Sequence, residues 1–147
     1  MSRMVSWASV LVASTLACAQ AQADIRIGVI LGLAGPNSSL GITYRRGLEL
    51  LPSEIGGEKL SVIVLDETSD PSMAVKNAQK LINDERIDVL TSPSSTPAAF
   101  AVAPVASGAR VPEIVLLTVG LSANEADWVV AIPQPGNIWI GPILDTQ

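Results

Sequence analysis

Four short apolar runs that alternate with segments of helical character are the feature that most constrains the fold. The runs are "IRIGVIL" (25–31), "LSVIVL" (60–65), "IDVL" (87–90) and "PEIVLLT" (112–118). They are continuous and do not alternate with polar residues, which is typical of strands buried on both faces. Strands separated by helices form right-handed strand–helix–strand units around a parallel sheet. The sequence therefore predicts an α/β fold with an open, doubly wound, mainly parallel sheet, and residues 127–132 are a candidate fifth strand.

Two of the three expected helices begin with the same local signal. Asp70-Pro71 and Thr96-Pro97 each place a capping side chain before a proline at the first helical position. The helix after Asp70 is amphipathic. Its apolar face is formed by Ala74, Val75, Ala78, Leu81 and Ile82. Its water-facing side is formed by Lys76, Asn77, Lys80 and Asp84.

The other helices have weaker signals. Residues 32–41 are rich in Gly, Pro, Asn and Ser and are expected as a loop, so the first helix is expected at 42–51. The third helix is expected at 98–106, and because it has almost no polar face we expect it between other elements. Pro104 should kink or end it. A turn is expected around Gly56-Gly57.

The first 23 residues have the pattern of a secretory signal peptide. Arg3 precedes an apolar segment (4–19), and Ala21-Gln22-Ala23 forms a small-x-small cleavage signal. Cleavage before Asp24 would leave residues 24–147 as the folded domain. Cys18, the sole cysteine, leaves open the alternative of a lipoprotein acylated at this residue.

The composition argues against several classes of function. The chain has no histidine, so Ser-His-Asp and Cys-His arrangements are impossible, and the mature chain would have no cysteine. A net charge of −5 without a basic cluster argues against nucleic-acid binding. The loop at 32–41 lacks both the P-loop lysine and a GxGxxG motif. We expect no enzyme activity, no cofactor and no metal.

Ligands of open α/β sheets bind beyond the carboxyl ends of the strands, which selects the loops at 32–41, 66–70, 91–96 and 118–124. Ser94, Ser95 and Thr96 lie where a strand ends and a helix begins. Free backbone N–H groups and the helix dipole favour an anion there, and the hydroxyls can hold a carboxylate or an ammonium group. The alternative is that Thr96 only caps the helix and the serines form a solvated loop.

Two further features have a functional and a structural interpretation. "DETSD" (66–70) has the charge for a cation site, but a solvated loop with Asp70 as the helix cap is the simpler interpretation. Trp128 and Trp139 could stack on a ligand, although a place in the core is the commoner fate of such residues.

Four segments together resemble a known family. They are "IRIGVILGLAGPNSSLG", "VIVLDETSDPSMAVKNAQKLI", "IDVLTSPSSTPAAFAVAPVA" and "VPEIVLL". In order and spacing they resemble the periplasmic substrate-binding proteins of branched-chain amino acid ABC transporters, the Leu/Ile/Val type. The resemblance covers about residues 24–145. It implies a partial lobe of the type I periplasmic-binding-protein fold, truncated within or just after the first of two lobes.

The resemblance also implies a ligand site. In that family the carboxylate and ammonium of the ligand are held between two lobes by two loops of the first lobe. Carried over, these loops correspond to Ser94, Ser95 and Thr96, and to Leu117, Thr118 and Val119. Two residues depart from the family's pattern: Ser92 stands where glycine is usual, and the bulky Leu117 stands where a small residue is usual.

The function implied is solute binding for an ABC uptake system in the periplasm, with an amino acid or related small carboxylate as ligand and the transporter's membrane subunits as partners. A second hypothesis is a non-binding fragment with a structural role, which self-associates through its exposed half-cleft. A third, an enzyme of flavodoxin-like topology, is disfavoured by the lack of histidine and of a nucleotide loop.

Overall fold

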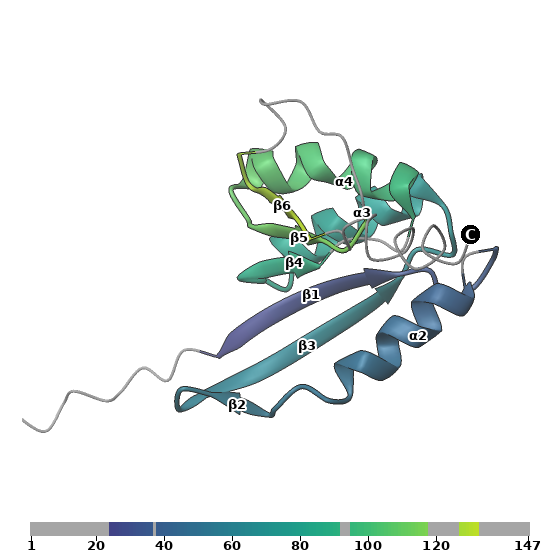
Figure 1. The fold of residues 1–147 in the computed structure, drawn as a ribbon. Coiled ribbons are helices and arrows are strands. Elements are labelled where there is room, and N and C mark those ends of the chain that lie inside the picture. Colours follow the sequence, from purple (N-terminus) through teal and green to yellow (C-terminus); the bar gives the residue numbers. More distant parts are fainter. Residues whose placement is uncertain (1–23, 37, 92–94, 118–126, 133–147) are drawn as a thin grey trace, which may run out of the picture.

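The computed structural model describes residues 24–36, 38–91, 95–117 and 127–132 (Figure 1). Strands and helices alternate along most of this length, as the sequence predicts. In chain order the elements are β1 (Ile25–Leu31), α2 (Ser38–Leu48), β2 (Glu54–Ile55), β3 (Glu58–Asp66), α3 (Pro71–Asn83), β4 (Val89–Thr91), α4 (Thr96–Ala109), β5 (Glu113–Val115) and β6 (Val129–Ala131).

The strands form one six-stranded sheet in the order β2-β3-β1-β4-β5-β6. Every neighbouring pair is parallel except β2 and β3, which form a hairpin. Gly56 and Gly57 close that hairpin with φ values of +63° and +89°, a backbone conformation that glycine adopts without a steric cost. The predicted open, mainly parallel sheet is confirmed.

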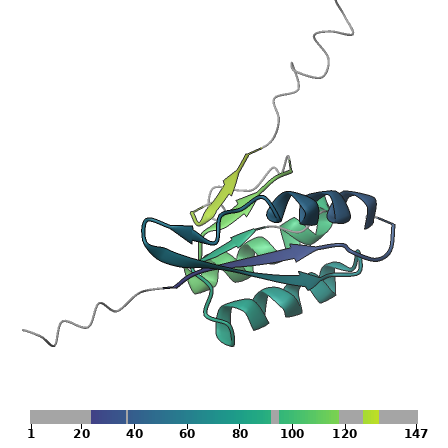
Figure 2. The same ribbon diagram turned by 90° about the horizontal axis from the view of Figure 1, so that it is seen from below.

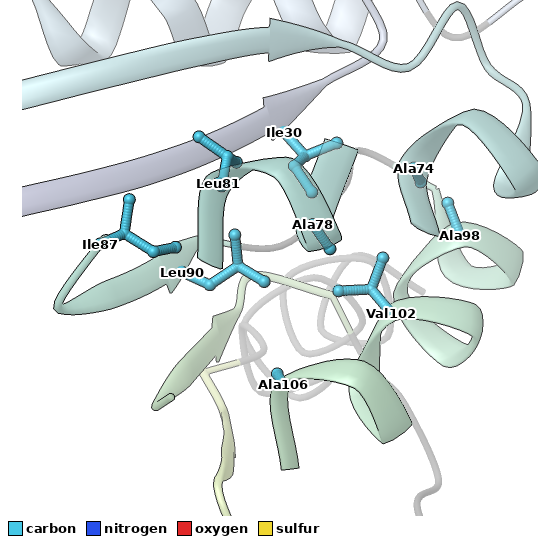
Figure 3. Packing of buried hydrophobic residues seen from close by; sticks show 9 residues of the cluster. All are labelled: Ile30, Ala74, Ala78, Leu81, Ile87, Leu90, Ala98, Val102 and Ala106. Carbon is cyan, nitrogen blue, oxygen red and sulfur yellow. The ribbon is translucent and has the colours of Figure 1, made fainter. Parts of the chain in front are cut away.

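Helices cover both faces of the sheet, but unequally. Figure 2 shows α2 on one side of the sheet and α3 on the other. The main core lies on the side of α3 and α4 (Figure 3). It is formed by Ile30, Ala74, Ala78, Leu81, Ile87, Leu90, Ala98, Val102 and Ala106. The alanines let α3 and α4 approach each other and the sheet closely, so Ile30 and Leu90 are completely buried.

The prediction for α2 is wrong at both ends. The helix begins at Ser38, inside the segment expected as a loop, and ends at Leu48. A Cβ on Gly41 would lie 2.1 Å from the carbonyl oxygen of Gly32, so the helix packs directly on the backbone that follows β1. This tertiary contact places residues of low helix propensity in the helix.

Pro104 does not end α4, which continues to Ala109. Pro104 is exposed, whereas Val102, Ala103 and Ala106 around it are buried. Burial of that face stabilises the helix across the proline. The helix packs between α3 and strands β5 and β6, as predicted, but one of its sides is open to solvent, where Phe100 is 41% exposed.

Two side chains lie elsewhere than the sequence predicts. Asn77, expected to face water, is partly buried and its Nδ2 donates a hydrogen bond of 2.8 Å to the carbonyl oxygen of Asp66. Trp128, for which the core was the commoner expectation, is 38% exposed. No helix within the described ranges is long and apolar enough to cross a membrane.

The core predicts the effect of a cavity. Leu81→Ala removes a fully buried side chain between α3 and the sheet and should lower the free energy of unfolding by about 2–5 kcal/mol. Urea denaturation followed by circular dichroism measures the change. The neighbouring residue Lys80 is exposed, so Lys80→Ala is the control and should change the free energy of unfolding by less than about 0.5 kcal/mol. Equal effects of the two substitutions would contradict this packing.

Candidate functional site

The carboxyl ends of β1, β3, β4 and β5 lie at the same edge of the sheet, because these strands are parallel. At this edge the chain leaves β1 for α2 on one face and leaves β4 for α4 on the other face. Strands β1 and β4 are neighbours, so the topological switch point of the sheet lies between them. Leu31 and Thr91, the last residues of the two strands, mark its position.

Asp66 organises one side of this edge. Its Oδ1 accepts hydrogen bonds from the backbone N–H of Leu33 (2.9 Å) and of Thr68 (2.7 Å). Ser69 Oγ donates to the carbonyl oxygen of Ala34 at 3.0 Å. The bonds from Leu33 and Ser69 tie the loop after β1 to the loop after β3.

Asp66 and Asp70, two of the acidic residues of "DETSD" (66–70), accept hydrogen bonds from the backbone of this loop and of α3. Asp70 is the N-cap of α3, and its Oδ1 accepts the N–H of Ser72 at 2.8 Å, as predicted. Within the described part of the chain, no three acidic, histidine or cysteine side chains are close enough to hold a metal ion. Glu67, for which the sequence predicts no separate role, is fully buried directly after β3.

The amino end of α4 lies on the other side of the switch point. Ser95, and not Thr96, is the N-cap: its Oγ accepts the N–H of Ala98 at 3.4 Å, and its extended backbone (φ −133°) precedes the helix. Thr96 is the first residue of the helix, and its side chain is exposed. The prediction that Thr96 caps the helix is therefore wrong.

This correction changes which hydroxyl is free to serve a ligand. The Thr96 hydroxyl is not used as the cap. Ser95 Oγ accepts one bond but keeps its own O–H as a donor. The first turn of α4 also presents backbone N–H groups and the positive end of the helix dipole, so this corner suits a carboxylate.

Of the remaining predicted site residues, the structure describes only Leu117. Leu117 is half-buried and packs against the cluster of Ala99, Ala103, Val115 and Val129 below α4. Its side chain therefore lies against the core, in the same corner as the first turns of α4. Ser94, Thr118 and Val119 lie outside the described residues.

Sequence reasoning missed an apolar cavity of about 260 Å³ on the face of the sheet that α2 covers. Val29, Leu31, Thr91 and Leu116 line it from the sheet, and Tyr44 and Leu48 line it from α2. No charged side chain lines it, so it cannot neutralise the charged groups of an amino acid. The helical spacing of Tyr44 and Leu48 indicates an inward face, but only the fold places Leu116 opposite them.

Comparison with known proteins gives consistent results. The sequence model of the family described as "Periplasmic binding protein" matches residues 24–137. The Leu/Ile/Val-binding protein BraC3 of Rhizobium johnstonii is 32% identical over 108 residues, which are 69% of this chain and 26% of that protein. The chain therefore spans about a quarter of the length of the curated relatives that it matches.

Solved structures agree in fold. Rp1789 of Rhodopseudomonas palustris CGA009 superposes with a TM-score of 0.77 at 38% identity, covering 84% of this chain and 36% of the other. A solute-binding protein of an ABC transporter from Rhodopseudomonas palustris BisB5, solved with 3,4-dihydroxybenzoic acid, has a TM-score of 0.67 at 30% identity. The alignment covers 74% of this chain and 31% of that protein's chain.

The reassigned helix cap predicts a difference between two neighbouring hydroxyls. Ser95→Ala removes the acceptor of the Ala98 N–H and should cost about 1 kcal/mol of stability. Thr96→Ala removes an exposed hydroxyl that caps nothing and should be nearly neutral. Thermal unfolding of the two variants measures both effects. A larger loss in Thr96→Ala than in Ser95→Ala would return the cap to Thr96.

Proposed function

The chain belongs to the family of periplasmic binding proteins, and on this premise we propose that residues 24–147 form the first lobe of the solute-binding component of an ABC uptake transporter. The family binds solutes without converting them, so we propose no catalytic residue. Residues 1–23 would act as the export signal to the periplasm, with lipid attachment at Cys18 as the alternative. The partners would be the membrane subunits of the transporter.

The ligand we propose is an amino acid or a related small carboxylate. Two observations on relatives support this class: the curated relatives are named Leu/Ile/Val-binding proteins, and one structural neighbour was solved with 3,4-dihydroxybenzoic acid. Both kinds of molecule join a carboxylate to an apolar body. The two kinds differ in the ammonium group, which only the amino acid carries.

The proposal depends most on the position of the amino end of α4 next to the switch point. The hydroxyls of Ser95 and Thr96 and the first N–H groups of α4 would hold the ligand's carboxylate. Ser94 would add a third hydroxyl. Leu117, Thr118 and Val119, after the neighbouring β5, would supply backbone groups from the other side, since Leu117 directs its side chain into the core.

The amine of an amino acid would need acceptors at the same corner. A hydroxyl can accept as well as donate, so Ser94 and Thr96 could bind the ammonium group while backbone N–H groups bind the carboxylate. An aromatic acid would leave these acceptors unused. Comparing the two ligand classes therefore tests which atoms at the corner take part.

A non-binding polypeptide with a structural role is the second candidate. It applies if the segment that the chain shares with its relatives, about a quarter of their length, does not hold a ligand by itself.

Calorimetric titration with leucine, isoleucine, valine, 4-hydroxybenzoate and 3,4-dihydroxybenzoate tests the binding proposal. We expect saturable heat for one of the two classes, and none for the amide of the same ligand, which lacks the carboxylate. If all five acids give no heat with the folded chain, the second candidate is correct.

The Thr96 hydroxyl provides a sharper test that leaves the helix cap intact. Thr96→Ala should weaken binding about 10-fold or more through loss of a hydrogen bond to a charged group, and Thr96→Ser should restore it. Ser72→Ala, which removes an exposed hydroxyl from the first turn of α3, is the matched control. Unchanged affinity in Thr96→Ala would remove this hydroxyl from the site.

A further inference from the structure

The loop after β1, residues 32–35, is anchored toward β3. Asp66 is the last residue of β3, and its Oδ1 accepts the N–H of Leu33 at 2.9 Å. Ser69 Oγ donates to the carbonyl oxygen of Ala34 at 3.0 Å. Strand β3 flanks β1 on one side, and β4 flanks it on the other. Both bonds therefore draw the loop to the side of β1 that lies away from β4.

The backbones of the two loops also pack closely. A Cβ on Gly35 would lie 2.8 Å from the carbonyl oxygen of Thr68, and the φ of Gly35 is +82°, so this position requires glycine. Thr68 and Ser69 have φ values of +50° and +61°. For a β-branched residue such as Thr68 this conformation is strained, and it persists where surrounding contacts hold it. The Thr68 N–H bonds to the same Oδ1 of Asp66 at 2.7 Å, so one carboxylate oxygen holds both loops.

The register of the sheet places the switch point on the other side of β1. The pairing of β1 with β3 continues to Leu31, which lies opposite Asp66. Its pairing with β4 ends earlier, at Val29, which lies opposite Thr91. The end of β1 therefore extends past β4 at the carboxyl edge, on the side where the chain leaves β4 for α4. The loop after β1 lies toward β3, and the switch point lies toward β4.

We propose that Asp66 is a positioning residue for the ligand site: it holds the loop after β1 beside β3 and so keeps the switch point accessible to a ligand. The inference rests on the proposed function and adds a residue that acts on the site without touching the ligand. Without the bonds to Asp66, Gly32 and Gly35 at the two ends of the loop allow it a wide range of backbone conformations. Some of these conformations place the loop at the switch point, where it competes with the ligand.

The expected loss of affinity follows from the populations of the loop. When the loop occupies the switch point, only the remaining fraction of molecules binds, and the apparent affinity falls by that fraction. We expect Asp66→Ala to weaken binding about 10-fold or more in calorimetric titrations with leucine and with 4-hydroxybenzoate. Asp66→Asn keeps an Oδ1 acceptor in the same place and should restore most of the affinity.

A paramagnetic label tests the position of the loop without any ligand. Ala34 is exposed, so a nitroxide can be attached to Ala34→Cys in a ¹⁵N-labelled chain that also carries Cys18→Ser. The label broadens amide signals as a steep function of distance. In the parent chain we expect stronger broadening at Ser69 than at Thr96. In Asp66→Ala the broadening at Thr96 should increase, because the loop moves toward the amino end of α4.

A second variant and a matched control accompany Asp66→Ala. Gly35→Ala separates the same two loops, because its Cβ would meet the carbonyl oxygen of Thr68, and it should give the same result if Asp66→Ala does not fold. Asp70→Ala is the control. Asp70 lies in the same loop, and its Oδ1 accepts the Ser72 N–H as the cap of α3. Its loss should lower the melting temperature but leave the broadening pattern and the affinity unchanged.

Two results would overturn the proposal while the proposed function stands. One is unchanged broadening at Thr96 in both Asp66→Ala and Gly35→Ala, because other contacts would then hold the loop. The other is an Asp66→Ala chain that folds and keeps the parent affinity. If the parent chain binds neither acid, the proposed function fails and the role of Asp66 in binding fails with it. The titration of the parent chain therefore distinguishes the two kinds of failure.

Discussion

The packing of Ile30 and Leu90 against α3 and α4 is the contact on which the rest of the structure depends. These side chains come from the adjacent strands β1 and β4, and their complete burial fixes both helices on one face of the sheet. Because α2 leaves β1 toward the opposite face, the same packing creates the switch point between β1 and β4. The amino end of α4 is thereby placed at that point, and the candidate site follows from the core.

The same arrangement separates a polar region from an apolar one. At the carboxyl edge, Asp66 holds two loops together and Ser95 caps α4, so hydroxyl and N–H groups are concentrated there. On the face that α2 covers, the strands and α2 line an apolar cavity without charged side chains. A carboxylate therefore suits the edge of the sheet and not the cavity.

Local signals in the sequence were sufficient to predict most of the fold. Continuous apolar runs identify the strands of the parallel sheet, and Asp70-Pro71 identifies the start of α3, because each signal acts within a few residues. The start of α2 could not be predicted, since it depends on the packing of Gly41 on the backbone of Gly32. No capping residue or helical pattern in the sequence reports that contact. The cap of α4 was misassigned because both Ser95 and Thr96 can cap, and only the backbone decides between them. The exposure of Trp128 depends on a helix layer that no local pattern reports.

The central claim is that a carboxylate binds at the amino end of α4. Its most direct test is a titration of the ¹⁵N-labelled chain with leucine and with 4-hydroxybenzoate, followed by amide chemical shifts. The account predicts that the largest shifts occur at Ser95, Thr96 and Ala98, with smaller ones at Leu117. Shifts confined to residues away from this corner, such as Val130 in β6, or no shifts at millimolar ligand, would contradict it.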